Sequence, residues 1–288
     1  VKYSSLSEYS SPTRLVILIK GLSEKTKLQS KEIKGPKVGV AKNILESFMK
    51  SQKVLKKQVF EKENKKGKFY FAKIESKQIL VKDILIKIIP KSLAAISWRK
   101  SMKWSDNNLL WGRPLRSIVA VFNKKLLPIK YSHLNSTDSV VIEKNLELKS
   151  KKIKNFSEYQ SALRLNNITV DHNERQKKII KKFEFICKTK NFKEYFNDKL
   201  LEEVTNIVED PNIILVDFNI EYLQIPQEII ISTLQRHQKY FPLFDKKERL
   251  TNYFLVVANK IDSKNLIKNG NKRVVEARLS DAKFFWEK

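Results

Sequence analysis

Two short segments carry the residue types best suited to binding chemistry. Residues 235–239 read Gln-Arg-His-Gln-Lys, a polar run between two apolar blocks, and three of its five side chains can carry charge. Residues 98–116 hold three of the chain's four Trp and three of its ten Arg. Because rings stack on bases and cations hold phosphates, residues 98–116 are candidates for a nucleic-acid surface. The alternative is that these Trp are core or rim residues and that the cations are only solvated.

A helix and a hairpin must position the polar run. Apolar residues at helical spacing follow Pro226, which suits a first helical turn, as far as Leu234. Residues 240–244 then read as a strand, and residues 252–259 read as its antiparallel partner. We expect His237 to form a hydrogen-bonded junction, in the core or at an interface, that fixes the angle between helix and hairpin. A direct nucleic-acid contact is the alternative.

The rest of the chain mixes strands and helices. We predict a loop over 1–11, a buried strand over 14–19, and further strands over 69–74, 117–122, 126–131 and 213–218. We predict helices over 44–49, over 81–88 with Pro90 just beyond the end, over 171–187, and over 198–208. This order indicates an α+β fold with mixed, largely antiparallel sheets and packed helices, in two lobes over 1–150 and 151–288.

The helix that begins near residue 171 has a recognisable start and two faces. Asp171 is followed three residues later by Glu174, a capping-box pattern. Cys187 belongs to the apolar side, so we predict a core residue and not a reactive thiol. Arg175 and the Lys residues around it are interpreted as a solvated face, with phosphate contact as the alternative.

The closing segment, residues 269–288, is predicted to be a helix. Its apolar stripe is expected to comprise Val274, Val275, Leu279 and Ala282, extended by Phe285 and Trp286. Arg278 and Asp281 are three residues apart and could pair on one face. We expect Arg273 and Arg278 to face a partner and the aromatic residues to anchor the helix; a plain surface helix is the alternative.

Composition narrows the class of protein. Apolar residues at 41% and charged residues at 31% are typical of a soluble globular protein, and no apolar run is long enough for a membrane. A single Cys excludes an internal disulfide and fits a reducing cytoplasm. The net charge of +27 would attract a polyanion such as nucleic acid. The large excess of Lys over Arg also fits a genome with biased composition, and both readings stay open.

Several kinds of reaction site have no signature in the sequence. Three scattered His and one Cys give no zinc-binding spacing. None of the six Gly falls in a nucleotide-binding loop, and no nucleophile elbow is present. The motifs with which ligases hold ATP, such as His-x-Gly-His, are also missing.

The sequence contains the blocks LQRHQKYFPLFD with FLVVAN, NGNKRVVEARLSDAKFFWEK, SSPTRLVILIKGL, KGPKV, MKWSDNNLLWGRPL and EEVTNIVEDPNIIL. In these blocks and in their order the chain resembles the beta subunit of the tetrameric bacterial glycine–tRNA ligase. The resemblance is to the amino-terminal part of that subunit. It implies a non-catalytic, tRNA-binding subunit that is needed for the ATP-dependent attachment of glycine to its tRNA. ATP and magnesium would then lie on the partner alpha subunit, with none in this chain. The alternatives are a scaffold that docks other subunit domains without contacting RNA, and a self-contained nucleic-acid-binding module.

The resemblance also points to site residues. Candidates for contact with tRNA or an interface are Arg14, Trp104, Arg113, Arg116, Gln235, His237, Lys239, Arg273 and Arg278. The sequence departs from the family at Arg116-Ser117, where His-Trp is usual, and the family's Thr-Arg-Gly-His-Arg-Phe segment has no counterpart. Glu248 stands where the family has Gly in the hairpin turn, so we expect a left-handed turn position to have been reshaped.

Overall fold

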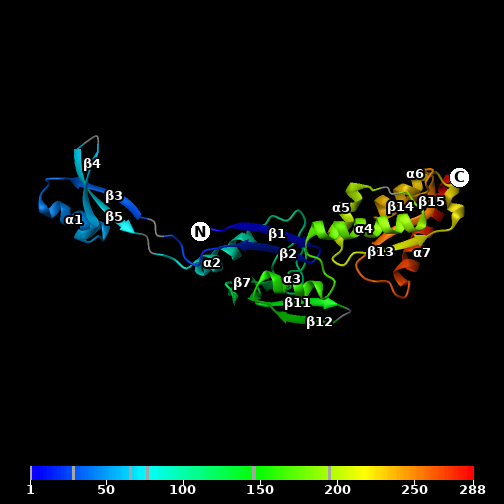
Figure 1. Ribbon diagram of the computed structural model, residues 1–288, viewed down its shortest axis with the longest axis horizontal. Helices are drawn as coiled ribbons and strands as arrows, with labels where there is room; N and C mark the ends of the chain where they lie inside the picture. Colours follow the sequence, from blue (N-terminus) through cyan, green and yellow to red (C-terminus); the bar gives the residue numbers. More distant parts are fainter. Residues whose placement is uncertain (1, 28–29, 65–66, 76–77, 145–146, 194–195) are drawn as a thin grey trace. The chain divides into compact units, whose positions relative to one another are not determined.

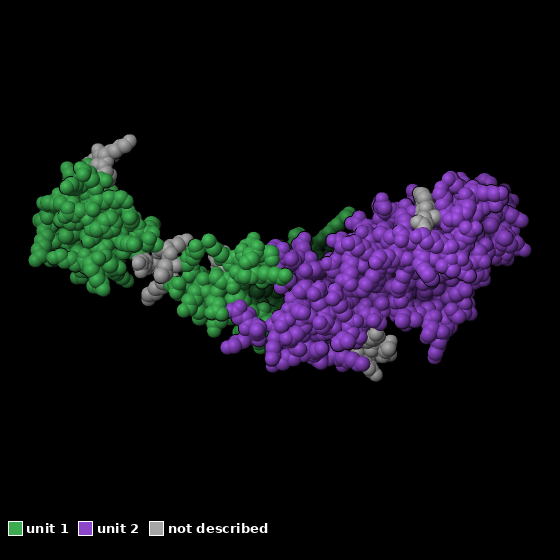
Figure 2. All heavy atoms as spheres, in the orientation of Figure 1, with its two compact units in different colours: residues 1–5, 19–122, 126–137 green, residues 6–18, 123–125, 138–288 purple. Residues whose placement is uncertain are grey.

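The chain forms two compact units, shown in a computed structural model (Figures 1 and 2). The structure describes residues 2–27, 30–64, 67–75, 78–144, 147–193 and 196–288. Unit 1 comprises Val1–Ser5, Ile19–Phe122 and Leu126–Thr137, and unit 2 comprises Leu6–Leu18, Asn123–Lys125 and Asp138–Lys288. Helices and mostly antiparallel sheets confirm the predicted α+β class. The domain boundary near residue 150 stays a prediction.

Unit 1 contains a small sheet with one helix. The sheet has strand order β3-β5-β4, and its bounds are β3 Ser30–Lys37, β4 Val59–Asn64 and β5 Gly67–Glu75. Helix α1, Lys42–Gln52, leads through the short 3-10 turn η1, Lys56–Gln58, into β4. Both the helix over 44–49 and the strand over 69–74 are therefore confirmed.

Helix α2 and several short strands make up the remainder of unit 1. Helix α2, Val81–Ala94, continues past Pro90, so the prediction that Pro90 lies beyond the helix was wrong. Pro removes one backbone donor, and here that loss does not end the helix. A sheet of order β6-β10-β9 contains β6 Ile118–Val119, β9 Lys130–Tyr131 and β10 Leu134–Thr137; β7 Val121–Phe122 pairs with β8 Lys125–Leu126. The strand expected over 117–122 is broken at Ala120, which donates its backbone N–H to Thr137.

The β1–β2 hairpin corrects two expectations about the start of the chain. Residues expected to be a loop form β1, Ser5–Ser11, which pairs with β2, Arg14–Lys20. Strand β2 was predicted to be buried, yet Leu15 and Ile17 are exposed. Pairing with a polar strand, and not burial, holds this apolar segment extended.

Unit 2 is built around the antiparallel sheet β13-β15-β14. Its elements are β11 Ser139–Lys144, β12 Glu147–Lys152, α3 Phe156–Arg164, α4 His172–Lys190, α5 Asp198–Ile207, β13 Asn212–Asp217, η2 Ile220–Gln224, α6 Gln227–Ser232, η3 Thr233–His237, β14 Phe241–Phe244, β15 Leu250–Ala258 and α7 Leu266–Trp286. The strands and helices expected over 171–187, 198–208, 213–218, 240–244 and 252–259 are all confirmed.

Both faces of this sheet are buried, which explains the continuous apolar sequence of β15. Leu255 joins the cluster of Phe183 and Cys187 from α4, whereas its neighbour Phe254 joins the cluster of Leu234 and Leu279 on the opposite face. Helices α4 and α5 thus cover one face, and α6 and α7 cover the other. Cys187 is fully buried, as predicted.

Candidate functional site

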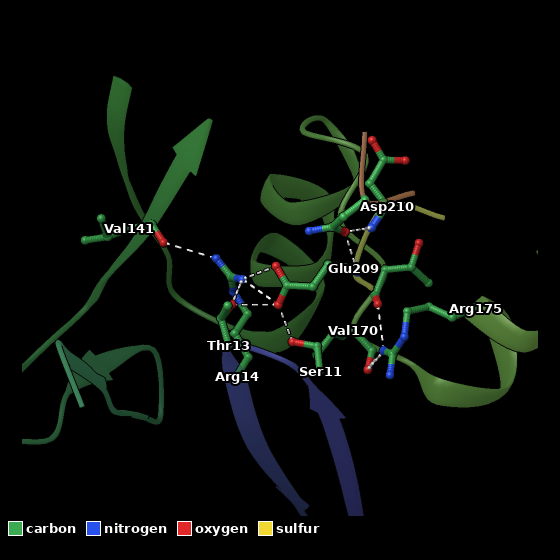
Figure 3. A network of polar contacts seen from close by, with 10 residues as sticks. Ser11, Thr13, Arg14, Val141, Val170, Arg175, Glu209 and Asp210 are labelled. Carbon is green, nitrogen blue, oxygen red and sulfur yellow. Dashed lines mark hydrogen bonds and ion pairs between the residues drawn. The ribbon is translucent and has the colours of Figure 1, made fainter. Parts of the chain in front are cut away.

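An ion pair between Arg14 and Glu209 lies at the centre of a polar network in unit 2 (Figure 3). Arg14 Nη1 donates to both carboxylate oxygens of Glu209, at 2.9 and 2.8 Å. Thr13 donates to the same carboxylate at 2.7 Å, and the Ser11 hydroxyl also donates to it. Only 15% of the Arg14 side chain and 9% of the Glu209 side chain are exposed.

The local fold positions these groups. Ser11 ends β1 and Arg14 begins β2, so the hairpin turn presents both side chains to the segment that follows α5. Asn259, after β15, accepts the backbone N–H groups of Glu209 at 2.7 Å and of Asp210 at 3.0 Å. The β1–β2 hairpin therefore holds the carboxylate of Glu209, and Asn259, which is distant in sequence from that hairpin, holds its backbone.

The environment keeps Glu209 ionised. Burial raises the pKa of this carboxyl, but the Arg14 guanidinium and the hydroxyls of Ser11 and Thr13 outweigh burial, and the pKa lies below its ordinary value. Because Arg14 is engaged in this pair, its guanidinium is not free in this conformation to hold a tRNA phosphate. Its candidate role in tRNA or interface contact stays a prediction.

Arg175 was interpreted as part of a solvated face, and this was wrong, because the residue is completely buried. Its Nε donates to Thr205 at 3.2 Å, and Nη1 donates to the carbonyls of Thr169 and Val170 at 2.8 and 2.9 Å. Burial lowers the pKa of the guanidinium. Spacing contained the signal: residues 175, 179, 183 and 187 recur every four positions, which places Arg175 on the apolar stripe of α4.

In unit 1, residues 98–116 form a clamped loop with an aromatic cluster. Met102 and Trp111 exchange backbone hydrogen bonds of 2.9 and 3.3 Å, which close the loop between them. The Trp111 ring lies 4.8 Å from that of Trp98 and 6.0 Å from that of Tyr131. Gly112 is needed here, because a Cβ at this position would come within 2.6 Å of the Trp98 ring.

The core interpretation of the Trp-rich segment holds for one of its three Trp, and the nucleic-acid interpretation stays a prediction. Trp111 is buried and is a core residue, whereas Trp98 and Trp104 are partly exposed. Trp104 meets His133 edge to face at 6.0 Å between ring centroids. The cations of the segment are all exposed: Arg99, Lys100, Lys103, Arg113 and Arg116. Half-buried rings can stack on bases and exposed cations can hold phosphates, so this segment is suited to a nucleic-acid surface.

The helix–hairpin junction of unit 2 is a π-helical turn, η3, in which Thr233 and Leu234 are buried. His237 is exposed, so the expectation that its side chain forms a hydrogen bond in the core was wrong; a place at an interface and a nucleic-acid contact stay predictions. The angle is fixed instead by Tyr240, whose N–H donates to the Leu234 carbonyl at 2.9 Å and whose hydroxyl donates to Asn271 of α7. The apolar pattern stops at Leu234, and a widened turn cannot be inferred from it.

The other two candidates of the junction make local contacts. The side-chain amide oxygen Oε1 of Gln235 accepts a long hydrogen bond of 3.4 Å from Nδ2 of Asn197. Lys239, which has a left-handed backbone with φ of 61°, pairs with Glu203 of α5 at 2.5 Å. Both side chains are partly exposed, so these contacts leave the polar run open to a partner.

Helix α7 buries less of its apolar surface than the sequence predicted. Val275 and Leu279 are fully buried, but Val274, Phe285 and Trp286 are exposed, so the aromatic residues do not anchor the helix. Val274 and Phe285 lie off the helical face that Val275 and Leu279 occupy, whereas Trp286 is on that face but at the exposed end of the helix. The exposed residues of α7 include the two candidates Arg273 and Arg278, and also Asp281. Among the residues that the structure describes, no ion pair joins Arg278 to Asp281.

The hairpin turn retains the left-handed conformation that was expected to be reshaped. Glu248 has a φ of 63° although it is not Gly. Its carboxylate pairs with Lys193. A left-handed turn position is thus compatible with Glu in this chain.

The described part of the chain contains neither a metal-binding cluster nor a membrane-spanning helix. No group of three or more His, Cys, Asp or Glu side chains there is arranged to hold a metal ion. None of the helices described is long and apolar enough to cross a membrane.

Comparison with known proteins identifies the family. The profile described as "Glycyl-tRNA synthetase beta subunit" matches residues 1–288. Proteins named "Glycine--tRNA ligase beta subunit" are similar along the whole chain. That of Rickettsia canadensis is 30% identical over 286 residues, covering 99% of this chain and 43% of the relative. That of Buchnera aphidicola is 33% identical over 299 residues, with 100% and 43% covered, and that of Dictyoglomus thermophilum is 31% identical over 293 residues, with 99% and 42% covered.

The chain spans less than half the length of these relatives. The match to the profile nevertheless extends over every residue of the chain, in agreement with the resemblance seen in its motifs. The chain therefore belongs to the glycyl-tRNA synthetase beta subunit family.

Proposed function

We propose that this chain serves glycyl-tRNA synthesis as a non-catalytic, tRNA-binding part of a beta subunit. The observation that carries the proposal is the match of all 288 residues to the family profile. The reaction joins glycine to its tRNA with ATP, and we place ATP and magnesium on a partner alpha subunit. Because tRNA is charged where translation takes place, we expect the protein to work in the cytoplasm.

The exposed cations of unit 1 support a tRNA contact. Arg113 and Arg116 follow the clamped loop that carries Trp104, and the whole chain has a net charge of +27. A surface that touches duplex RNA backbone should lose about 0.9 log unit of affinity per phosphate contact for each tenfold rise in salt. Binding of glycine tRNA should accordingly be steeply salt-dependent.

A second candidate function, docking of other subunit domains, is favoured by helix α7. Leu266 is 70% exposed and Phe285 is 76% exposed, and Val274 lies between them on the same helix. Exposed apolar side chains in such number are typical of an interaction surface. Under this reading Arg273 and Arg278 would contact protein and not RNA.

Aminoacylation by a complete alpha–beta enzyme separates the two functions. In the RNA-contact reading, Arg113→Gln with Arg116→Gln should raise the KM for tRNA and leave the assembly intact. In the docking reading, Arg273→Gln with Arg278→Gln should weaken assembly, measured by analytical ultracentrifugation. If neither variant changes KM or assembly, the candidate residues have no part in the function.

The non-catalytic role has its own test. Purified chain without any partner subunit should show no glycine-dependent exchange of pyrophosphate into ATP. Exchange by the isolated chain would refute the assignment of amino-acid activation to the partner.

A further inference from the structure

Within unit 1, the segments on either side of residues 30–75 pair with each other. Thr26 donates its backbone N–H to Ile79 at 2.9 Å, and Val81 donates to Glu24 at 2.8 Å. Lys25 and Leu80 form an antiparallel bridge at the same place. The β3-β5-β4 sheet and α1 therefore form an insert with its own small core, in which Ala72 is completely buried.

One face of the insert sheet is covered by α1. The Phe48 ring of α1 lies so close to Gly35 that a Cβ there would approach it to 2.7 Å. In the register of the sheet, Ile33 pairs with Ala72, and Val59 pairs with Ala72 from the other side. Since strand side chains alternate between faces, these residues share the covered face with Gly35.

The opposite face carries three Phe. Phe69 and Phe71 are two residues apart on the central strand β5, and Phe60 lies opposite Phe71 on β4, with 6.2 Å between these two ring centroids. All three rings are partly exposed. No described helix or strand outside the insert makes extensive contact with the sheet. We call these three Phe, with the cations around them, the insert face.

Lysines surround these rings. Lys34 Nζ lies 3.6 Å from the centre of the Phe69 ring, and Lys62 Nζ lies 5.6 Å from that of Phe71. The register places Lys37 and Lys73 on the same face. The only acidic side chain described there is Glu32, which pairs with Lys62 at 2.6 Å.

The insert has a large excess of positive charge, and its surface has a hollow beside Phe60. Residues 30–75 contain thirteen Lys and five Glu and no other charged residue. A hollow beside Phe60 is lined by Leu55, Lys57, Gln58, Phe60 and Lys73. An aromatic ring, that of Phe60, and two cations, Lys57 and Lys73, thus line the same hollow at one edge of the insert face.

We propose that the insert face binds unpaired nucleotides of single-stranded RNA. Phe60, Phe69 and Phe71 provide rings on which successive bases stack, and the surrounding lysines hold the phosphates. Lys is a point charge that attracts a backbone without reading bases, so binding tolerates many sequences. An acidic protein would use the charges but gains little from three partly exposed rings set in a row. The inference rests on the RNA partner of the proposed function and names unpaired nucleotides as what this face holds.

The test uses residues 1–288, fluorescein-labelled oligouridylate, and an RNA duplex of mixed sequence, with fluorescence anisotropy as the readout. Replacing Phe69 and Phe71 by Leu removes stacking but retains apolar packing. We expect affinity for oligouridylate to fall by about 5- to 30-fold and affinity for duplex to change little. Phe185→Leu, at a ring that is 70% exposed on α4, is the matched control and should have no effect.

A second variant tests the lysines. Lys34→Gln with Lys37→Gln should reduce the slope of log affinity against log salt by about 1.4, because single strands lose about 0.7 per phosphate contact. Circular dichroism of each variant establishes that the insert remains folded. Unchanged affinity in the Phe variant, or an equal loss for duplex, would overturn the proposal.

Two outcomes separate this inference from neighbouring ideas. If polyglutamate competes as well as RNA and the Phe variant binds RNA normally, the face is a docking surface for acidic protein and the inference is wrong. Aminoacylation by the complete enzyme tests the proposed function separately, because oligouridylate binding requires no ligase activity. If the oligouridylate results fail while aminoacylation behaves as expected, this inference is wrong. If aminoacylation fails while the oligouridylate results hold, the proposed function is wrong.

Discussion

Replacing Arg14 by Met should destabilise unit 2 strongly, because it leaves the Glu209 carboxylate buried without its cation. Removal of one partner from a buried pair typically costs about 3–5 kcal/mol. The side chains of this pair are 15% and 9% exposed, and Ser11 and Thr13 continue to donate to the carboxylate. We therefore expect the lower end, about 3 kcal/mol, which corresponds to a fall in Tm of about 6–12 °C for a unit of this size.

The loss should depend on pH in a definite direction. The folded-state pKa of Glu209 is below its ordinary value, so the stabilisation by the pair is complete above the unfolded pKa, about 4.3. It disappears as pH falls through the folded pKa. In the variant, burial remains and raises the pKa, so Glu209 can become neutral at mildly acidic pH. The difference in Tm between wild type and variant should be largest near neutral pH and shrink below about pH 5.

Thermal unfolding followed by circular dichroism at several pH values measures these effects. Arg249→Met breaks an exposed pair with Asp245 of 2.7 Å in the same unit and is the matched control, with no measurable shift expected. A double variant, Arg14→Met with Glu209→Gln, should lose less than the sum of the single variants, because no charge is left unpaired. An unchanged Tm at pH 7, or additive losses, would refute the idea that the ion pair organises the network.

Three other substitutions test features of the fold. Gly112→Ala places a Cβ 2.6 Å from the Trp98 ring and should cost about 1–3 kcal/mol, measured by denaturant unfolding with Trp fluorescence. His237→Ala should change stability by less than about 0.5 kcal/mol, since the side chain is exposed, whereas Tyr240→Phe should cost about 1 kcal/mol. Glu248→Gly should raise Tm by about 2–4 °C, because Gly adopts the left-handed turn without steric cost; a fall in Tm would show that the pair with Lys193 outweighs backbone strain.

Local patterns in the sequence predicted much of unit 2. Asp171 accepts the backbone N–H of Glu174 at 2.9 Å, as the capping-box pattern indicated. The continuous apolar run of β15 fits a strand buried on both faces, and the stripe ending in Cys187 lies in the core. In each case the signal comes from residues close in sequence, whose periodicity reports directly on burial.

The predictions that were wrong or missing concern residues whose structure depends on contacts distant in sequence. The spacing of α4 placed Arg175 on the apolar stripe, but a buried guanidinium also needs acceptors, and one of its three carbonyl partners, that of Thr205, lies 30 residues away in sequence. Strand β1 forms because β2 pairs with it, although its own sequence is polar. The insert face was not recognised because Phe60 and Phe71 are separated along the chain, and only the register of β4 with β5 brings them together.

Lys and Arg are distributed differently in this chain, which suggests different roles in attracting phosphates and in reading bases. Arg14 and Arg175 are used inside unit 2, where planar guanidinium groups satisfy a carboxylate and several carbonyls. The insert contains Lys and no Arg, which suits attraction of phosphates in any sequence. Base edges are read best by the fork of Arg. If this chain contributes to the choice of tRNA, exposed Arg residues such as Arg113 and Arg278 are suited to reading its bases. Replacing them by Lys should then reduce the selectivity between tRNAs more than the affinity for tRNA.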